Sequence, residues 1–169
     1  MPKSSHSKQR EPGLQGPMRP ITGVITMEDG ITVSTTQANW TTAAQLLNVA
    51  VDTIYFDDKS RVSVTAGDDI SLPPGVWEVD LHPTFVNGSA GDRDAEVAVT
   101  NEGGTTIYGS SPVSILNANQ DQQVRVVAQF HLTTQTTIQL RARTDGATVT
   151  INDESYIGVF RKIGNVNET

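Results

Sequence analysis

Hydrophobic and polar residues alternate most regularly in the segment 70–85, which reads ISLPPGVWEVDLHPTF. From residue 76 onward the large apolar residues share one face, and we expect them in the core: Trp77, Val79, Leu81 and Phe85. This period of two is typical of a strand with one buried face. The Pro-Pro-Gly turn at 73–75 does not fit inside a central strand. The pattern therefore predicts a short strand at 70–72, a corner, and a long strand from residue 76 to 85.

Similar alternation recurs along the rest of the chain. Residues 124–132 place Phe130 and four other apolar residues on one face, and residues 136–143 continue the pattern after a polar turn. Turn signals recur about every 8 to 12 residues, which is typical of an all-β sandwich or barrel. Further strands are expected at 61–65, 95–101, 105–109, 112–116 and 148–151.

Three segments allow more than one interpretation or carry no apolar pattern. Residues 21–27 and 31–36 form either a hairpin or a linking ribbon around the turn at 28–30. Residues 41–47 form either one or two helical turns or a direct lead into a strand at 47–56. Residues 117–123 are wholly polar, so we expect a loop there.

The last expected strand, 156–163, is apolar on both sides. Ile157, Val159 and Ile163 alternate with Tyr156, Gly158 and Phe160. A strand that is apolar on both sides is buried on both sides. Because one face of a single-domain sandwich should meet water, we expect this strand to contribute to a subunit interface. The alternative is that residues 21–36 of the same chain cover it.

The order of short strand, Pro-Gly turn and aromatic strand in ISLPPGVWEVDL resembles jelly rolls of the tumour necrosis factor and complement globular-head type. The late pair QVRVVAQFHL and TTIQLRAR and the closing VFRKI support the resemblance, which spans residues 46–163. With these short loops, the chain is similar to trimeric minor virion proteins of tailed bacteriophages, such as head fibres, decoration proteins and tail appendages. The resemblance implies a jelly-roll β-sandwich and a homotrimer, with the last strand near the threefold axis.

Charge divides the 169 residues unevenly. Residues 1–20 carry a net charge of +3, with one glutamate against four basic side chains: Lys3, Lys8, Arg10 and Arg19. Residues 21–169 carry 8 basic and 18 acidic groups, a net charge of −10. We expect an extended basic arm with its ribbon at 1–36, a jelly-roll domain at 37–169, and no nucleic-acid partner for the acidic body. The arm is either a disordered tail or a segment that orders on an acidic capsid or tail protein.

The amino-acid composition limits where the protein could be made and located. The chain has no cysteine, which fits synthesis in a reducing cytoplasm. It has no apolar run long enough to span a membrane, and its first twenty residues lack an apolar signal core. We therefore expect no membrane partner and synthesis in the host cytoplasm. The resemblance to phage virion proteins implies that the protein is located in the virion.

Candidate catalytic and metal-binding motifs are scarce, so we expect no enzyme and no cofactor. The chain lacks a Gly-Xaa-Ser-Xaa-Gly elbow, a phosphate-binding GxxxxGK[ST] loop and the His-Xaa-His pair of metal-binding cupins. His82 and His131 could form a metal site only by pairing across a sheet. Acidic loops at 57–58, 68–69 and 92–96 leave calcium open as an alternative to plain solvated loops.

These patterns favour a structural virion protein, a trimeric knob attached through its arm. The alternative is an adhesin that binds a host-surface glycan or protein through the polar loops 87–93 and 117–123. Trp40 is expected as a cap on the core or an interface anchor rather than a sugar platform. A secreted signalling ligand is disfavoured by the missing signal core and cysteines.

Overall fold

A computed structural model gives the fold for residues 21–27, 31–33, 39–41, 46–47, 49–54, 63–65, 69–145, 149–151 and 156–164. These described residues form fifteen strands and one short 3-10 helix, η2 (Glu102–Gly104). The first seven strands are β1 (Ile21–Met27), β2 (Ile31–Val33), β3 (Val49–Ile54), β4 (Ser63–Thr65), β5 (Asp69–Leu72), β6 (Gly75–Leu81) and β7 (Thr84–Asn87). The others are β8 (Arg93–Asn101), β9 (Ile107–Ser110), β10 (Ser114–Leu116), β11 (Asp121–Gln123), β12 (Val126–Leu132), β13 (Thr136–Thr144), β14 (Val149–Ile151) and β15 (Tyr156–Gly164).

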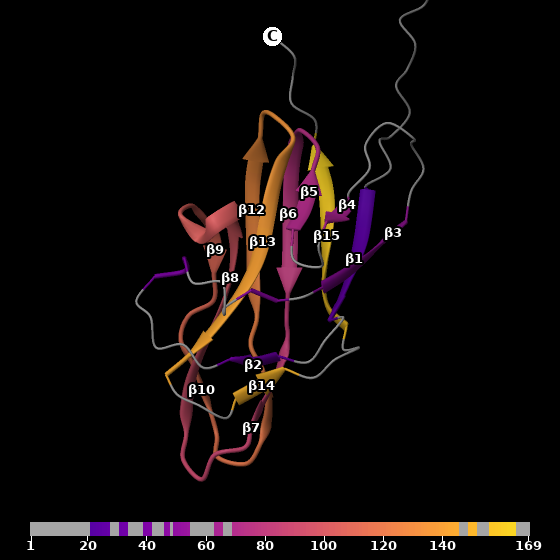
Figure 1. Cartoon of the computed structure of the whole chain (residues 1–169). Helices are drawn as coiled ribbons and strands as arrows, with labels where there is room; N and C mark the ends of the chain where they lie inside the picture. Colours follow the sequence, from indigo (N-terminus) through magenta and orange to yellow (C-terminus); the bar gives the residue numbers. More distant parts are fainter. Residues whose placement is uncertain are drawn as a thin grey trace, which may run out of the picture.

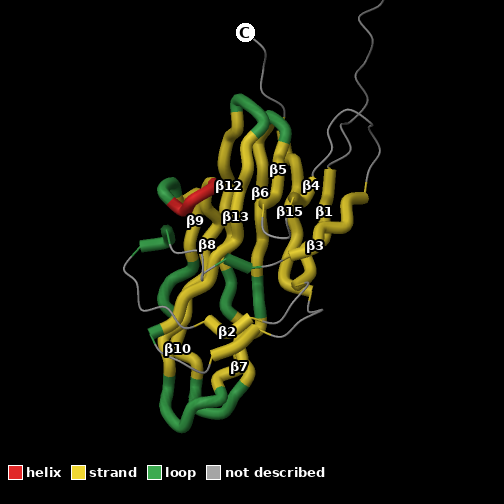
Figure 2. Tube along the Cα trace, in the orientation of Figure 1, coloured by secondary structure: helices red, strands yellow, loops and turns green. Residues whose placement is uncertain are grey.

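The chain is an all-β jelly-roll sandwich, as the sequence predicts. One layer is a five-stranded sheet in the order β12-β6-β15-β1-β3, and the other is a six-stranded sheet in the order β10-β8-β13-β5-β4, with β9 also paired to β8 (Figures 1 and 2). Alternate residues of both sheets meet in one core, which follows from the period of two in each strand.

A four-stranded sheet, β11-β7-β14-β2, extends the first layer. Its order repeats that of β12-β6-β15-β1, and each of its strands is the chain neighbour of the corresponding strand. In Figure 1 its strands lie at the lower end of the molecule. The two sheets are therefore two parts of one layer, separated between β6 and β7 at the buried Pro83, which has no N–H to donate to a ladder.

The residues expected in the core are buried in the structure. Trp77, Val79, Leu81 and Phe85 have no exposed surface, and Phe130 is 9% exposed. Trp77 meets Phe160 of β15 edge-to-face, with 5.9 Å between ring centroids, and its Nε1 donates a hydrogen bond to the carbonyl oxygen of Pro73 at 2.9 Å. Trp77 thus stabilises both the corner before β6, through its hydrogen bond, and the centre of the core, through its ring contact.

Two features differ from the sequence-based expectations, and the structure decides one alternative that the sequence left open. The strand expected at 76–85 is two strands in two sheets, because Pro83 interrupts it. The wholly polar segment 117–123 contains β11, which pairs with β7; an edge strand exposed to solvent needs no apolar face. The segments 21–27 and 31–33 are not paired as a hairpin, because β1 lies between β15 and β3 while β2 pairs with β14.

Residues on both sides of the expected boundary at residue 36 therefore share sheets. The basic residues Lys3, Lys8, Arg10 and Arg19 precede β1 and lie outside the described part of the chain, as does most of the segment 41–47. Within the described residues, no helix is long and apolar enough to cross a membrane.

Candidate interaction surface

The side of the five-stranded sheet that faces away from the core forms the candidate surface, which we call the outer sheet face. Alternation along β6 and β12 places buried residues inward and half-buried or exposed residues outward. The outer sheet face comprises Val24 and Thr26 of β1, Val76, Glu78 and Asp80 of β6, Val127, Gln129 and His131 of β12, and Val159 and Arg161 of β15. No described segment of the chain covers it.

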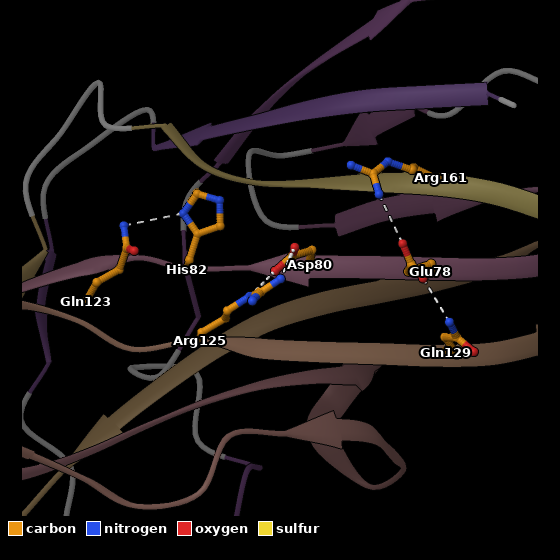
Figure 3. A network of polar contacts seen from close by, with 7 residues as sticks. All are labelled: Glu78, Asp80, His82, Gln123, Arg125, Gln129 and Arg161. Atoms are coloured by element: carbon orange, nitrogen blue, oxygen red, sulfur yellow. Dashed lines mark hydrogen bonds and ion pairs between the residues drawn. The ribbon is translucent and has the colours of Figure 1, made fainter.

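Asp80 and Arg125 form a two-pronged ion pair at this surface (Figure 3). Nε of Arg125 lies 2.8 Å from Oδ1 of Asp80, and one terminal nitrogen lies 2.7 Å from Oδ2. This parallel arrangement is the strong form of the arginine–carboxylate contact. Hydrogen bonding from Arg125 is the main cause that lowers the pKa of Asp80. Burial opposes it as the second largest effect, and the positive charge of Arg125 lowers the pKa further.

Glu78 lies between two further partners on the same face. Arg161 of β15 donates a hydrogen bond to Oε1 at 3.1 Å, and the amide of Gln129 of β12 donates one to Oε2 at 2.8 Å. One carboxylate therefore connects β12, β6 and β15 (Figure 3).

Around β6 and β15 the charges of the outer sheet face are balanced, although the body of the chain is acidic. Glu78 and Asp80 are each paired with one arginine, so these four charges sum to zero. Between them lie valines, of which Val127 is 50% exposed. Beside the network, Nε2 of Gln123 lies 3.5 Å from Nδ1 of His82. A partly apolar face on which Glu78 and Asp80 are paired within the chain is suited to contact with another protein surface.

The last strand contributes less exposed apolar surface than its alternation predicts. Ile157 and Phe160 have no exposed surface and belong to the chain's own core, whereas Val159 is half-buried and Ile163 is 49% exposed. The ladders skip Ile157 opposite β1 and Ile163 opposite β6, so two β-bulges interrupt the simple alternation. An interface on β15 would therefore use Val159 and Ile163, with Ile157 and Phe160 behind them. For Tyr156, only its pairing with Thr26 is described.

The two polar loops that the sequence singles out lie together in the structure. The side-chain amide of Asn87, which is buried, donates hydrogen bonds of 3.0 to 3.1 Å to the carbonyl oxygens of Gly91, Leu116 and Asn117. Oδ1 of Asp92 accepts a 3.0 Å hydrogen bond from the backbone of Ala118. The sequence places Asn87 in a candidate binding loop, but a polar residue at a strand end gives no sign of the distant carbonyl groups that it binds.

The opposite side of the sandwich is partly covered. Trp40 is only 4% exposed, and the guanidinium carbon of Arg143 lies 4.4 Å from its ring centroid, so this tryptophan is packed and is no open sugar platform. Arg143 also forms an ion pair with Glu96. Arg141, 2% exposed, donates a 2.5 Å hydrogen bond to Gln139; no local pattern marks this buried arginine in the sequence.

The described residues contain no group of three or more His, Asp or Glu side chains that could hold a metal ion. His131 pairs with Val76 at the start of β6, whereas His82 follows the end of that strand. Val76 and His82 are six residue steps apart along the strand, about 20 Å. The two histidines therefore do not meet across the sheet. The acidic segment 57–58 lies outside the described residues.

No protein-family model and no curated protein matches the chain. Among solved structures, the chain is similar to murine APRIL crystallised at pH 8.0, with a TM-score of 0.54 and 12% identity over 86% of this chain and 100% of that one. It is also similar to Eiger TNF from S. frugiperda, with a TM-score of 0.56 and 12% identity over 89% of this chain and 97% of that one. At such low identity the likeness establishes the fold, which is the predicted jelly roll of the tumour necrosis factor type.

Proposed function

We propose that the chain is a non-enzymatic structural protein that assembles as a homotrimer through the outer sheet face and serves as a knob on a tailed-phage particle. The observation that carries the proposal is the outer sheet face itself, which is partly apolar, pairs Glu78 and Asp80 with arginines and is uncovered by any described segment. The jelly-roll fold supports it, because the sequence resembles trimeric proteins of this fold.

Electrostatics favours this face as the contact between copies. Residues 21–169 carry a net charge of −10, so two copies repel each other over most of their surfaces. On the outer sheet face the carboxylates of Glu78 and Asp80 already have arginine partners within the chain. Copies that meet around β6, β12 and β15 bury Val127 and Val159 while Glu78 and Asp80 keep their arginine partners.

The positions of the chain ends support attachment through residues 1–20, the part of the expected arm 1–36 that precedes β1. Ile21 pairs with Lys162, so β1 begins where β15 ends, at the upper end of Figure 1. The four basic side chains of residues 1–20 precede this point in the chain. We propose that they bind an acidic surface of the major capsid or tail protein, and that three arms in one trimer multiply the affinity.

Deletion of residues 1–20 tests the attachment. The truncated protein is expected to remain a folded trimer and to stop co-sedimenting with particles. A full-length variant in which Lys3, Lys8, Arg10 and Arg19 are replaced by glutamate should fail in the same way, whereas replacement by glutamine should weaken binding less. Retained attachment of the truncated trimer would place the anchor in the knob instead.

A second candidate function, adhesion to a host-surface glycan, is favoured by the loop cluster that Asn87 assembles. The loops 88–92 and 117–120 lie at the lower end of Figure 1, opposite the start of β1, where an attached knob would meet a cell. Their exposed amide and carboxylate groups can hydrogen-bond sugars. Binding of the isolated trimer to a glycan array, with loss on Asn119→Ala or Gln120→Ala substitution, would support this function over a purely structural one.

A further inference from the structure

Arg93 begins β8 directly after the loop 88–92, at the lower end of Figure 1. Its side chain is half-buried, and its Nε is buried without a hydrogen-bond partner. No described residue forms a hydrogen bond or an ion pair with its guanidinium group. Polar groups that leave water normally find a partner, because an unpaired one costs free energy. Arg93 therefore carries a positive charge that the chain itself does not use.

The register of β8 places Arg93 on the side of the sheet that faces the core. Ala95, two residues further on, is buried in the core, and so is Leu116, the direct partner of Arg93 on β10. Side chains two residues apart on a strand, and those directly opposite on a paired strand, share one side. The other layer contributes Asn87, whose amide binds the carbonyl oxygen of Leu116. Arg93 thus lies between the layers, at the end of the sandwich where the loop cluster stands.

The carboxylates that lie nearest to Arg93 in the strands point to other sides. Asp94 follows it on β8 and therefore faces away from the core, where it is exposed. Asp121 of β11 stands opposite Val86, which is on the outer side of β7. Asp92 precedes the strand, and its Oδ1 accepts the hydrogen bond from Ala118. The chain is acidic around Arg93 but offers it none of these carboxylates.

Arg93 differs in this respect from the other arginines of the described residues. Their partners are carboxylates for Arg125, Arg143 and Arg161 and a side-chain amide for Arg141. The pair of Arg125 shows the preferred contact, in which Nε and one terminal nitrogen bind the two oxygens of one carboxylate. Arg93 has the same donors, so its missing partner is an anionic group from outside the chain.

We propose that Arg93 binds the anionic group of an acidic glycan, a carboxylate or a phosphate, which rests on the second candidate function, adhesion through the loop cluster. The exposed amides of Asn119 and Gln120 in the same cluster can hydrogen-bond sugar hydroxyl groups. A neutral sugar would leave Arg93 without a partner, so an acidic sugar is favoured. Elsewhere the net charge of −10 on residues 21–169 repels anions, which makes Arg93 the selective contact.

The test titrates the full-length protein with matched pairs of sugars: trigalacturonic acid and its methyl ester, sialyllactose and lactose, and mannose 6-phosphate and mannose. We expect an acidic member to bind at least about tenfold more tightly than its neutral counterpart. This comparison uses the wild type alone and does not depend on the folding of a variant. The pair in which the difference appears distinguishes a carboxylate from a phosphate as the bound group.

Two variants separate a contact with Arg93 from general charge attraction. Arg93→Gln should reduce the affinity for the acidic sugar to that for its neutral counterpart, and Arg93→Lys should retain part of it, because lysine keeps the charge without the fork. Arg143→Gln removes the same charge on the other side of the sheet and should leave the affinity within about twofold. Without sugar, Arg93→Gln should keep the melting temperature of the wild type, because no partner within the chain is lost.

The outcomes distinguish this inference from the adhesin function on which it rests. Equal binding of acidic and neutral sugars, or unchanged affinity of Arg93→Gln, would overturn the role of Arg93 and leave glycan adhesion standing. Absence of binding to every sugar would overturn both, without bearing on the trimer. A melting temperature of Arg93→Gln well below that of the wild type would reveal a partner within the chain and would also overturn the proposal.

Discussion

Phe160 shows how a residue near the end of the chain contributes to the centre of the core. Its ring packs against Trp77, and Trp77 in turn holds the corner through its hydrogen bond to Pro73. Replacement of Phe160 by alanine is expected to lower the free energy of unfolding by about 3 to 5 kcal/mol, because it leaves a cavity beside Trp77. Urea unfolding of the folded Phe160→Ala variant should show this loss of stability. Val113→Ala, at an exposed position, serves as a nearly neutral control. A loss as small as that of the control would place Phe160 outside the core.

Asp80 makes the free energy of unfolding depend on pH. Its pKa is lower in the folded chain, chiefly because Arg125 donates hydrogen bonds to its carboxylate. The resulting stability is therefore fully present above the pKa of the unfolded chain, about 3.9, and is lost as the pH falls through the lower folded pKa. Below about pH 4, unfolding free energy should fall more steeply for the wild type than for Asp80→Asn. Identical slopes would mean that the ion pair does not form in solution.

At the scale of elements, the close pairing of β15 with β6 depends on a residue without a side chain. A Cβ at Gly158 would lie 2.3 Å from the carbonyl oxygen of Asp80, which is backbone and cannot move alone. Gly158→Ala is expected to destabilise the fold by about 1 to 3 kcal/mol or more, since the strands must separate. Gly91→Ala is the matched control, because a Cβ there meets nothing within 4 Å. Thermal unfolding of the two variants decides the point, and equal melting temperatures would contradict the pairing.

Local alternation predicts most of the strands but not how they are joined into sheets. Trp77, Val79 and Leu81 mark β6 because apolar residues at every second position fit a half-buried strand. The division at Pro83 could be anticipated from its missing N–H, but the transfer of β7 to another sheet depends on distant partners. β1 enters the main sheet through pairing with β15, about 130 residues away, which no local pattern specifies.

The sequence predicts the candidate surface only in part, because local patterns identify strands but not the distant residues with which they interact. The sequence points to the last strand, and Val159 and Ile163 are accessible there, but bulges redirect Ile157. The ion pairs of Glu78 and Asp80 could not be predicted, because each joins residues more than 40 positions apart in the sequence. Asn87 likewise depends on partners about 30 positions away.

At the scale of the whole molecule, the strands place different properties in different regions. The chain enters β1 and leaves β15 at one end, the polar loops lie at the other, and the outer sheet face runs between them (Figure 1). Arg93 lies between the two layers, at the end with the polar loops. Attachment, exposure of loops and contact between copies can thus occur together without competing for one surface.

The molar mass of the protein in solution, measured by light scattering after size exclusion, tests the central proposal most directly. With 18.2 kDa per chain, a homotrimer has a mass of about 55 kDa. We expect this mass for the wild type and for Val113→Lys, and the mass of a single folded chain for the double variant Val127→Lys, Val159→Lys. A wild type that elutes as a single chain at all concentrations, or a double variant that remains a trimer, would contradict assembly through the outer sheet face.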